Sequence, residues 1–144
     1  MTEETKDTIP TKEAAPKAAK PKGKKQKRSV VAGQMHIKAT FNNTIIAFSD
    51  KKGNVLTTSS AGGAGFRGSK KGTAYAAQIA AEKSTENAKQ QFGMKSVDVF
   101  VKGVGLGRDA AIRVLSSYEI SINSIQDVTP IPHGGVRMRR MRRG

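Results

Sequence analysis

The sequence has 144 residues with no cysteine, and its 26 lysines and arginines outnumber its 11 acids, which gives a formal net charge of +15. Without cysteine it forms neither disulfides nor thiolate metal sites, and it holds no long apolar run of the kind that spans a membrane. A self-repelling charge of this size persists most readily when a polyanion neutralises it. Composition therefore favours a nucleic-acid-binding protein with one domain and basic extensions.

The first segment, residues 1–28, consists mainly of Lys, Ala, Pro and Glu and carries nine basic and four acidic residues. It has almost no apolar side chains to bury, so folding would not offset the conformational entropy lost on ordering. We expect residues 1–28 to be a disordered basic extension. An α/β domain over residues 29–132 and a basic C-terminal tail over residues 133–144 are expected to follow.

Three strands are predicted in the first part of the domain. Residues 34–40 alternate between apolar and polar side chains, and residues 44–49 and 55–60 are rich in residues that favour strands. The connections at 41–43 and 50–54 contain Asn, Asp or Gly, which are typical of turns. We therefore expect three consecutive antiparallel strands.

A long helix is predicted between Thr73, a plausible N-cap, and Gly93, a plausible C-terminal glycine. Helical spacing places Tyr75, Ala76 and Ala80 on one face. Most of the residues on that face are alanine, which allows the helix to approach a sheet closely.

Strand and helix patterns then alternate, with a strand at 97–102, a helix at 108–117 and a strand at 120–126. The full order, βββαβαβ, predicts a mixed five-stranded sheet with helices packed on it. Its pairing should be antiparallel at the start and parallel at the end.

The loop over residues 61–72 combines five glycines with Arg67, Lys70 and Lys71. It does not match a Walker motif, because no lysine directly follows its glycines at the required spacing. Three cations in a loop of small residues suggest that its backbone lies against RNA while the cations meet phosphates.

The loop over residues 103–107 follows a strand, precedes a helix, and has Asp127 twenty residues beyond it. This arrangement imitates a dinucleotide-binding unit. Its spacing is G-x-G-x-G, however, and three strands in succession are not a Rossmann opening, so we expect no nucleotide, cofactor or small-molecule substrate. Backbone amides at a helix N-terminus beside Arg108 instead favour a phosphate of RNA.

The distribution of acidic residues along the sequence gives little support for an enzymatic function. Only Asp98 and Asp127 lie in or next to the predicted parallel strands, whereas a two-metal nuclease needs several converging carboxylates. We expect neither an enzyme nor a metal site.

The tail, residues 133–144, contains five arginines and neither lysine nor acid. Arginine binds phosphates with two parallel hydrogen bonds and stacks on exposed bases, which suits folded RNA. A protein that compacts duplex DNA is the rival class.

Four stretches resemble the small-subunit ribosomal protein eleven family, the universal S-eleven family, in its bacterial form. They are FNNT at 41–44, AGGAGFRGSKKGTAYAAQIAAE at 61–82, VKGVGLGRDAAIRVL at 101–115 and DVTPIPHGGVR at 127–137. The resemblance implies a ribonuclease-H-like fold without nuclease activity, in a cytoplasmic ribosome. It also implies a place on the platform of the small subunit, bound to 16S-type rRNA near the mRNA exit and E site. Neighbouring platform proteins, especially the eighteenth, would be partners, with mRNA nearby and no membrane.

The RNA-binding residues expected from this resemblance and from the charge pattern lie in the first strand and its turn, the two glycine loops and the tail. They are Lys38, Asn42, Asn43, Gly65, Arg67, Gly68, Ser69, Lys70, Lys71, Gly103, Gly105, Gly107, Arg108, His133, Gly134, Gly135, Arg137, Arg139, Arg140, Arg142 and Arg143. Many relatives have prolines where this chain has Val104 and Leu106, so its second loop is expected to be less rigid.

Overall fold

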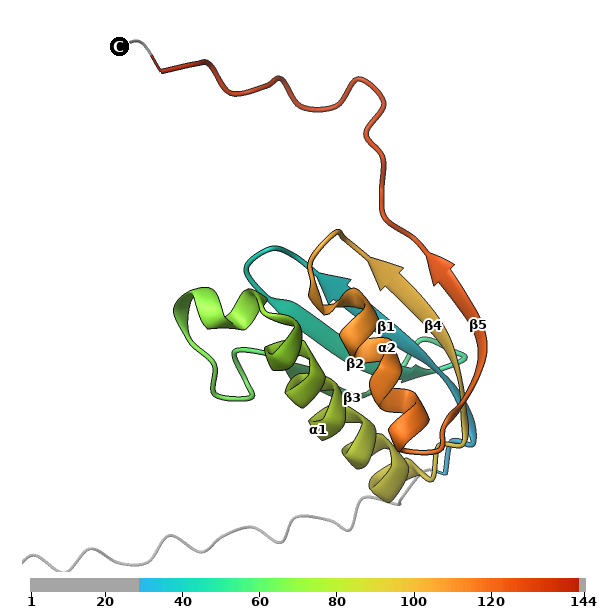
Figure 1. The fold of residues 1–144 in the computed structure, drawn as a ribbon. Helices are drawn as coiled ribbons and strands as arrows, with labels where there is room; N and C mark the ends of the chain where they lie inside the picture. Colours follow the sequence, from blue (N-terminus) through green and yellow to red (C-terminus); the bar gives the residue numbers. More distant parts are fainter. Residues whose placement is uncertain (1–28, 143–144) are drawn as a thin grey trace, which may run out of the picture.

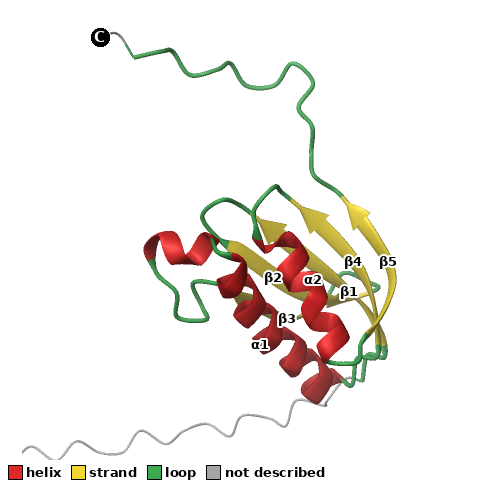
Figure 2. Ribbon diagram, in the orientation of Figure 1, coloured by secondary structure: helices red, strands yellow, loops and turns green. Residues whose placement is uncertain are grey.

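The computed structural model describes residues 29–142, which form one five-stranded sheet with two α-helices on one of its faces (Figures 1 and 2). The elements are β1 (Ala32–Ala39), β2 (Thr44–Asp50), β3 (Val55–Ser60), the 3-10 helix η1 (Gly68–Gly72), α1 (Ala74–Phe92), β4 (Ser96–Lys102), α2 (Gly107–Ser117) and β5 (Ser121–Asp127). The predicted order of strands and α-helices is confirmed, and η1 is an addition to it. The predicted extension at 1–28 and the site residue Arg143 lie outside the described residues.

The strand order is β3-β2-β1-β4-β5, so the first strand of the chain is the central strand of the sheet. The pairs β1–β2 and β2–β3 are antiparallel, whereas β1–β4 and β4–β5 are parallel. The mixed sheet predicted from the sequence is thereby confirmed. Because β1, β4 and β5 run in the same direction, their carboxyl ends lie at one end of the sheet.

The core lies between the sheet and the two helices. Alternation along the strands buries Met35 and Ile37 of β1 and Val99 of β4 on the face that the helices cover. The inner face of α1 is mostly alanine, as expected from the sequence. The placement of Tyr75 on that face is wrong, because its side chain is 62% exposed at the first turn of the helix. Its ring packs edge-on against Phe66 of the preceding loop, with 5.9 Å between the ring centroids.

The predicted ends of α1 are confirmed by their hydrogen bonds. The Thr73 hydroxyl accepts from the Ala76 amide at 3.3 Å, which satisfies one of the unpaired donors of the first turn. Gly93 adopts the left-handed conformation at φ 67°, and its amide donates to the Lys89 carbonyl at 3.0 Å. Within residues 29–142, no helix is both long enough and apolar enough to cross a membrane.

Candidate nucleic-acid interface

Three loops come together at the carboxyl end of the parallel strands, at the top of Figure 1. They are the β1–β2 turn (40–43), the β4–α2 loop (103–106) and the segment after β5 (128–132); we call this region the tail end of the sheet. The loop that contains η1 is adjacent, because a Cβ atom on Gly72 would collide with the main-chain oxygen of Phe41. The fold therefore brings sequence-distant site residues together.

The β1–β2 turn is closed by Thr40 and Asn43. The Thr40 amide and hydroxyl both donate to the Asn43 carbonyl at 2.9 Å, and the Asn43 amide donates to the Thr40 hydroxyl at 3.1 Å. Asn42 is exposed, as a direct contact to RNA would require, and Phe41 beside it is 76% exposed. Of the two predicted asparagines, Asn43 is half-buried, and its side-chain oxygen has no hydrogen-bond partner among the described residues.

A second cation stands beside the predicted Lys38. Lys38 of β1 pairs in register with Lys102 of β4, so both side chains lie on the sheet face that carries no helix. Both are exposed, and like charges on neighbouring strands repel one another unless an anion lies between them. Sequence reasoning missed Lys102, because only the parallel register places it next to Lys38.

The predicted contact residues of the loop over residues 61–72 are exposed except for Lys71, which is half-buried. Gly65 and Gly68 have positive φ angles of 103° and 58°, and a Cβ atom at either would meet nothing within 4 Å. Arg67 donates from Nη1 to the carbonyl oxygens of Gly62, at 2.6 Å, and Phe66, at 3.1 Å. Within residues 29–142 no carboxylate forms an ion pair with this loop. Its cations are available to phosphates.

The glycines of the second loop are packed against the protein itself. A Cβ atom at Gly103 would collide with the carbonyl oxygen of Ala39, and one at Gly105 with that of Thr40. Gly107 is the buried first residue of α2, where a side chain would collide with β2 and α1. Intramolecular packing alone thus requires all three glycines, and their contact with RNA stays a prediction.

Arg108 and Asp127 form an ion pair at the tail end, with 2.6 Å between Nη2 and Oδ2. Arg108 Nη1 also donates to the Gly103 carbonyl at 2.6 Å. Hydrogen bonds from the Thr129 side chain, and then the Arg108 guanidinium, lower the pKa of Asp127 to about 2. In the sequence, Asp127 lies at the spacing expected of the acid that binds ribose in a dinucleotide-binding unit. In the structure it is instead the partner of Arg108.

The C-terminal segment leaves the tail end of the sheet without helix or strand and extends away from it as far as residue 142 (Figure 1). Its predicted contact residues are all exposed: His133, Gly134, Gly135, Arg137, Arg139, Arg140 and Arg142. Residues 133–142, the described part of the tail, contain neither helix nor strand.

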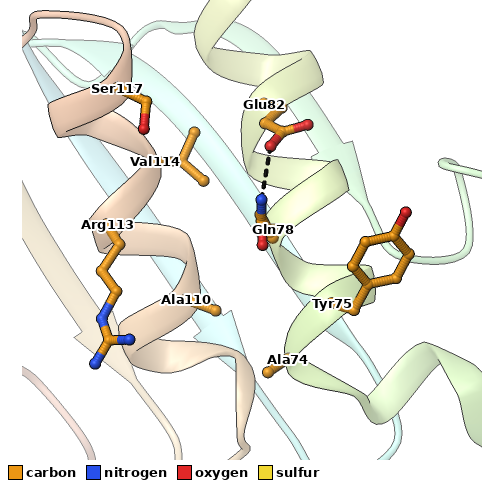
Figure 3. Close-up of a pocket in the computed structure, with 8 residues that line it drawn as sticks. All are labelled: Ala74, Tyr75, Gln78, Glu82, Ala110, Arg113, Val114 and Ser117. Atoms are coloured by element: carbon orange, nitrogen blue, oxygen red, sulfur yellow. Dashed lines mark hydrogen bonds between the residues drawn. The ribbon is translucent and has the colours of Figure 1, made fainter.

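A groove lies between α1 and α2 (Figure 3). Gln78 Nε2 donates to Glu82 Oε1 at 2.9 Å across one turn of α1, while Arg113 of α2 and Tyr75 point away from each other. Glu82 is the one carboxylate in this lining, and histidine does not contribute to it. The groove therefore presents neither a pair of carboxylates nor a carboxylate–histidine pair. Among the described residues, no three side chains of the metal-binding types cluster.

Comparison with known proteins finds a matching family model and similar curated sequences. The model of the ribosomal protein S11 family matches residues 33–143, a range that contains the β1–β2 turn, both glycine loops and nearly all of the tail. Small ribosomal subunit protein uS11 of Saccharophagus degradans is 51% identical over 130 residues, which cover 87% of this chain and 98% of that protein.

Proposed function

We propose, from the premise that this chain belongs to the ribosomal protein S11 family, that it binds 16S-type rRNA through the tail end of its sheet, the loop over residues 61–72 and the C-terminal tail. Family membership makes it a structural component of the small ribosomal subunit and not an enzyme. The proposal concerns which of its surfaces contact rRNA and where in the subunit they lie.

The observation that carries the proposal is the gathering of cations around one end of the sheet. Lys38 and Lys102 lie side by side on the open face of the sheet, and the β1–β2 turn lies against Gly72, next to Lys70 and Lys71. The arginine-rich tail leaves from the same end. Phosphate contacts of this kind supply most of the affinity of a protein for nucleic acid.

The proposed surface contrasts with the rest of the described chain in its electrostatics. The two described ion pairs, Lys89–Glu119 and Arg108–Asp127, leave the lysines of the proposed surface without an acidic partner. Uncompensated cations close together are more stable when a polyanion binds them. This supports rRNA as the ligand of this end.

The division of the chain belongs to the same proposal, with residues 29–132 as the RNA-binding body and residues 133–144 as a basic arm. A ribonuclease-H-like fold is proposed for the body and is supported by the strand order β3-β2-β1-β4-β5 with its antiparallel and parallel halves. The position proposed in the subunit is the platform, near the mRNA exit and E site. Neighbouring platform proteins, especially the eighteenth, are the proposed protein partners, and the four family-like stretches support this placement.

The experiment is a salt titration of the full chain on small-subunit rRNA, compared with duplex DNA of the same length. The test variant replaces the tail arginines with glutamine: Arg137, Arg139, Arg140, Arg142 and Arg143. If each of the five arginines neutralises one phosphate, the slope of log K against log salt falls by roughly 3.5 to 4.5, at about 0.7–0.9 per contact. An unchanged slope contradicts the proposed role of the tail. Equal affinity of the wild-type chain for duplex DNA would instead favour a DNA-compacting protein.

A further inference from the structure

A closed ring of hydrogen bonds joins four segments at the tail end of the sheet. Arg108, in the first turn of α2, bridges the Gly103 carbonyl and the Asp127 carboxylate, both at 2.6 Å. Asp127 Oδ1 accepts from the amide of Thr129 at 2.9 Å and from its hydroxyl. The same hydroxyl accepts from the Gly103 amide at 3.0 Å, which closes the ring. We call these four residues the bracket.

The bracket fixes to the body the segment after β5 (128–132), which leads into the tail. Val128 continues the sheet pairing, because its amide donates to the Val101 carbonyl at 2.8 Å. Thr129 is then held by Asp127 and Gly103, and the residues after it are Pro130, Ile131 and Pro132. Proline has a fixed φ and restricts the residue before it to extended conformations, so the direction set at Thr129 is transmitted outward.

The bracket also changes the environment of the Arg108 charge. The Arg108 side chain is 30% exposed, and the carboxylate of Asp127 lies directly on its guanidinium. A phosphate approaching Arg108 would meet a compensated charge, and it would be repelled by the adjacent carboxylate. The cations of the loop over residues 61–72 have no such partner among the described residues.

We propose that Arg108 and Asp127 are positioning residues, which act through Thr129 to set the direction in which the arginine-rich tail leaves the sheet. Arg108 then holds parts of the chain together, a role that we call a strut, and is not a phosphate ligand. This inference rests on the proposed function in one respect, namely that the tail it aims is the part that binds rRNA.

Three substitutions separate a strut from a phosphate ligand. Asp127→Asn keeps an oxygen for the Thr129 amide but removes the charge that holds Arg108. Arg108→Lys keeps the positive charge but cannot bridge two acceptors with a planar fork. Arg108→Gln removes the charge altogether. Arg113→Gln is the matched control, because Arg113 is an exposed arginine of the same helix outside the bracket.

The two roles predict opposite results for rRNA binding. If Arg108 is a strut, all three bracket variants weaken rRNA binding about threefold. This is the loss expected when the fraction of molecules whose tail points in the binding direction falls to about a third. The salt slope stays unchanged. For a phosphate ligand, Arg108→Lys binds like the wild type, Arg108→Gln lowers the slope by about 0.7–0.9, and Asp127→Asn strengthens binding by releasing Arg108. Any one of these three outcomes overturns the proposal.

A second readout needs no RNA. The chain has no cysteine, so spin labels attach only to cysteines introduced at Ser117, on α2, and at His133, just past the prolines. We expect a narrow distribution of distances between the labels in the otherwise wild-type chain and in Arg113→Gln. Asp127→Asn and Arg108→Lys should broaden it, with circular dichroism unchanged. Equal widths in all four proteins overturn the proposal. If the proposed function fails instead, the labels still respond but the wild-type chain does not bind rRNA.

Discussion

The loops over residues 61–72 and 103–107 both follow a strand and combine glycines with an arginine within or just after them, but the surroundings of their glycines differ. At Gly65 and Gly68 an added Cβ atom would meet nothing within 4 Å, whereas at Gly103 and Gly105 it would collide with main-chain oxygens of β1 and its turn. At these two positions of the first loop, therefore, glycine allows left-handed backbone on an open surface. In the second, it allows one part of the protein to lie directly against another.

We propose that this difference separates two kinds of contribution to RNA binding. The loop over residues 61–72, called the open loop below, has cations without acidic partners among the described residues, as contacts with phosphates would require. The loop over residues 103–107, called the packed loop, has its adjacent arginine paired with Asp127, which supports a role in positioning the tail. Substitutions in the packed loop should consequently affect folding first, whereas charge substitutions in the open loop should affect RNA binding without affecting folding.

The largest effect is expected from Gly105→Ala. The new methyl group meets the carbonyl oxygen of Thr40, which is main chain and cannot turn aside. We expect the free energy of unfolding to fall by about 1–3 kcal/mol, the usual cost of overpacking, measured by urea denaturation. Gly62→Ala is the control, because the nearest atom to its Cβ would be 3.6 Å away, in ordinary contact. If Gly105→Ala is as stable as the control, the packed loop is not a rigid part of the fold.

The next effect concerns the charges of the open loop. Replacing Lys70 and Lys71 with glutamine should lower the salt slope of rRNA binding by roughly 1 to 2, at about 0.7–0.9 per phosphate. The melting temperature should not change. Lys51→Gln with Lys52→Gln is the matched control, since it removes the same charge from the β2–β3 turn at the other end of β2. If the slope falls equally in both double variants, rRNA binding depends on the net charge of the chain and not on the position of these lysines.

A smaller effect is expected from the backbone of the open loop. Gly68 has φ 58°, so Gly68→Ala should cost about 1 kcal/mol of stability through strain alone. Gly68→Asn should cost less, because asparagine tolerates the left-handed region better than alanine does. Thermal melts of the two variants compare them directly. If both variants lose the same stability, a factor other than the backbone angle φ determines which residues are tolerated at position 68.

The smallest effect is expected from pH. The pKa of Asp127 is lowered from 3.8 to about 2, so the folded state favours the carboxylate. Its contribution is therefore complete above pH 3.8 and is lost as the pH falls through about 2. The distance between labels at positions 117 and 133 should stay narrowly distributed at about pH 5 and broaden only in stronger acid. Asp127→Asn should show no such transition, and broadening of the wild type at about pH 5 would contradict the assignment.

Most secondary structure is predictable here because its signals are local. Thr73 and Gly93 mark the two ends of α1 by their own chemistry, and alternation along 34–40 indicates which side chains of β1 are buried. Tyr75 was misplaced because its aromatic character and helical spacing suggest burial. In the fold, the first turn of α1 packs against the preceding loop through Phe66.

The candidate site was less predictable because its contacts join distant segments. The sequence shows that Asp127 lies twenty residues beyond the glycine loop and next to a predicted strand, but nothing local shows that it faces Arg108. The pairing of Lys38 with Lys102 likewise depends on the register of two parallel strands. Composition identifies both glycine loops as unusual, but only the packing distinguishes an open glycine from a packed one.

The central position of β1 has a consequence for the order of folding during synthesis. Ala39 pairs with nearby Thr44, whereas Ala32 pairs with Ser96, and closing the longer loop costs more entropy, about 0.6 kcal/mol for each doubling in length. We expect the β1–β3 meander to form while β4 and β5 are still being made, which pulse-labelled hydrogen exchange would show as earlier protection of β2 than of β5. The bracket is assembled from the last-made half. If the bracket sets the direction of the tail as proposed, a tail in that direction is present only on a fully folded body. Ribosomal RNA that binds such a tail would then select fully folded molecules from a newly synthesised population.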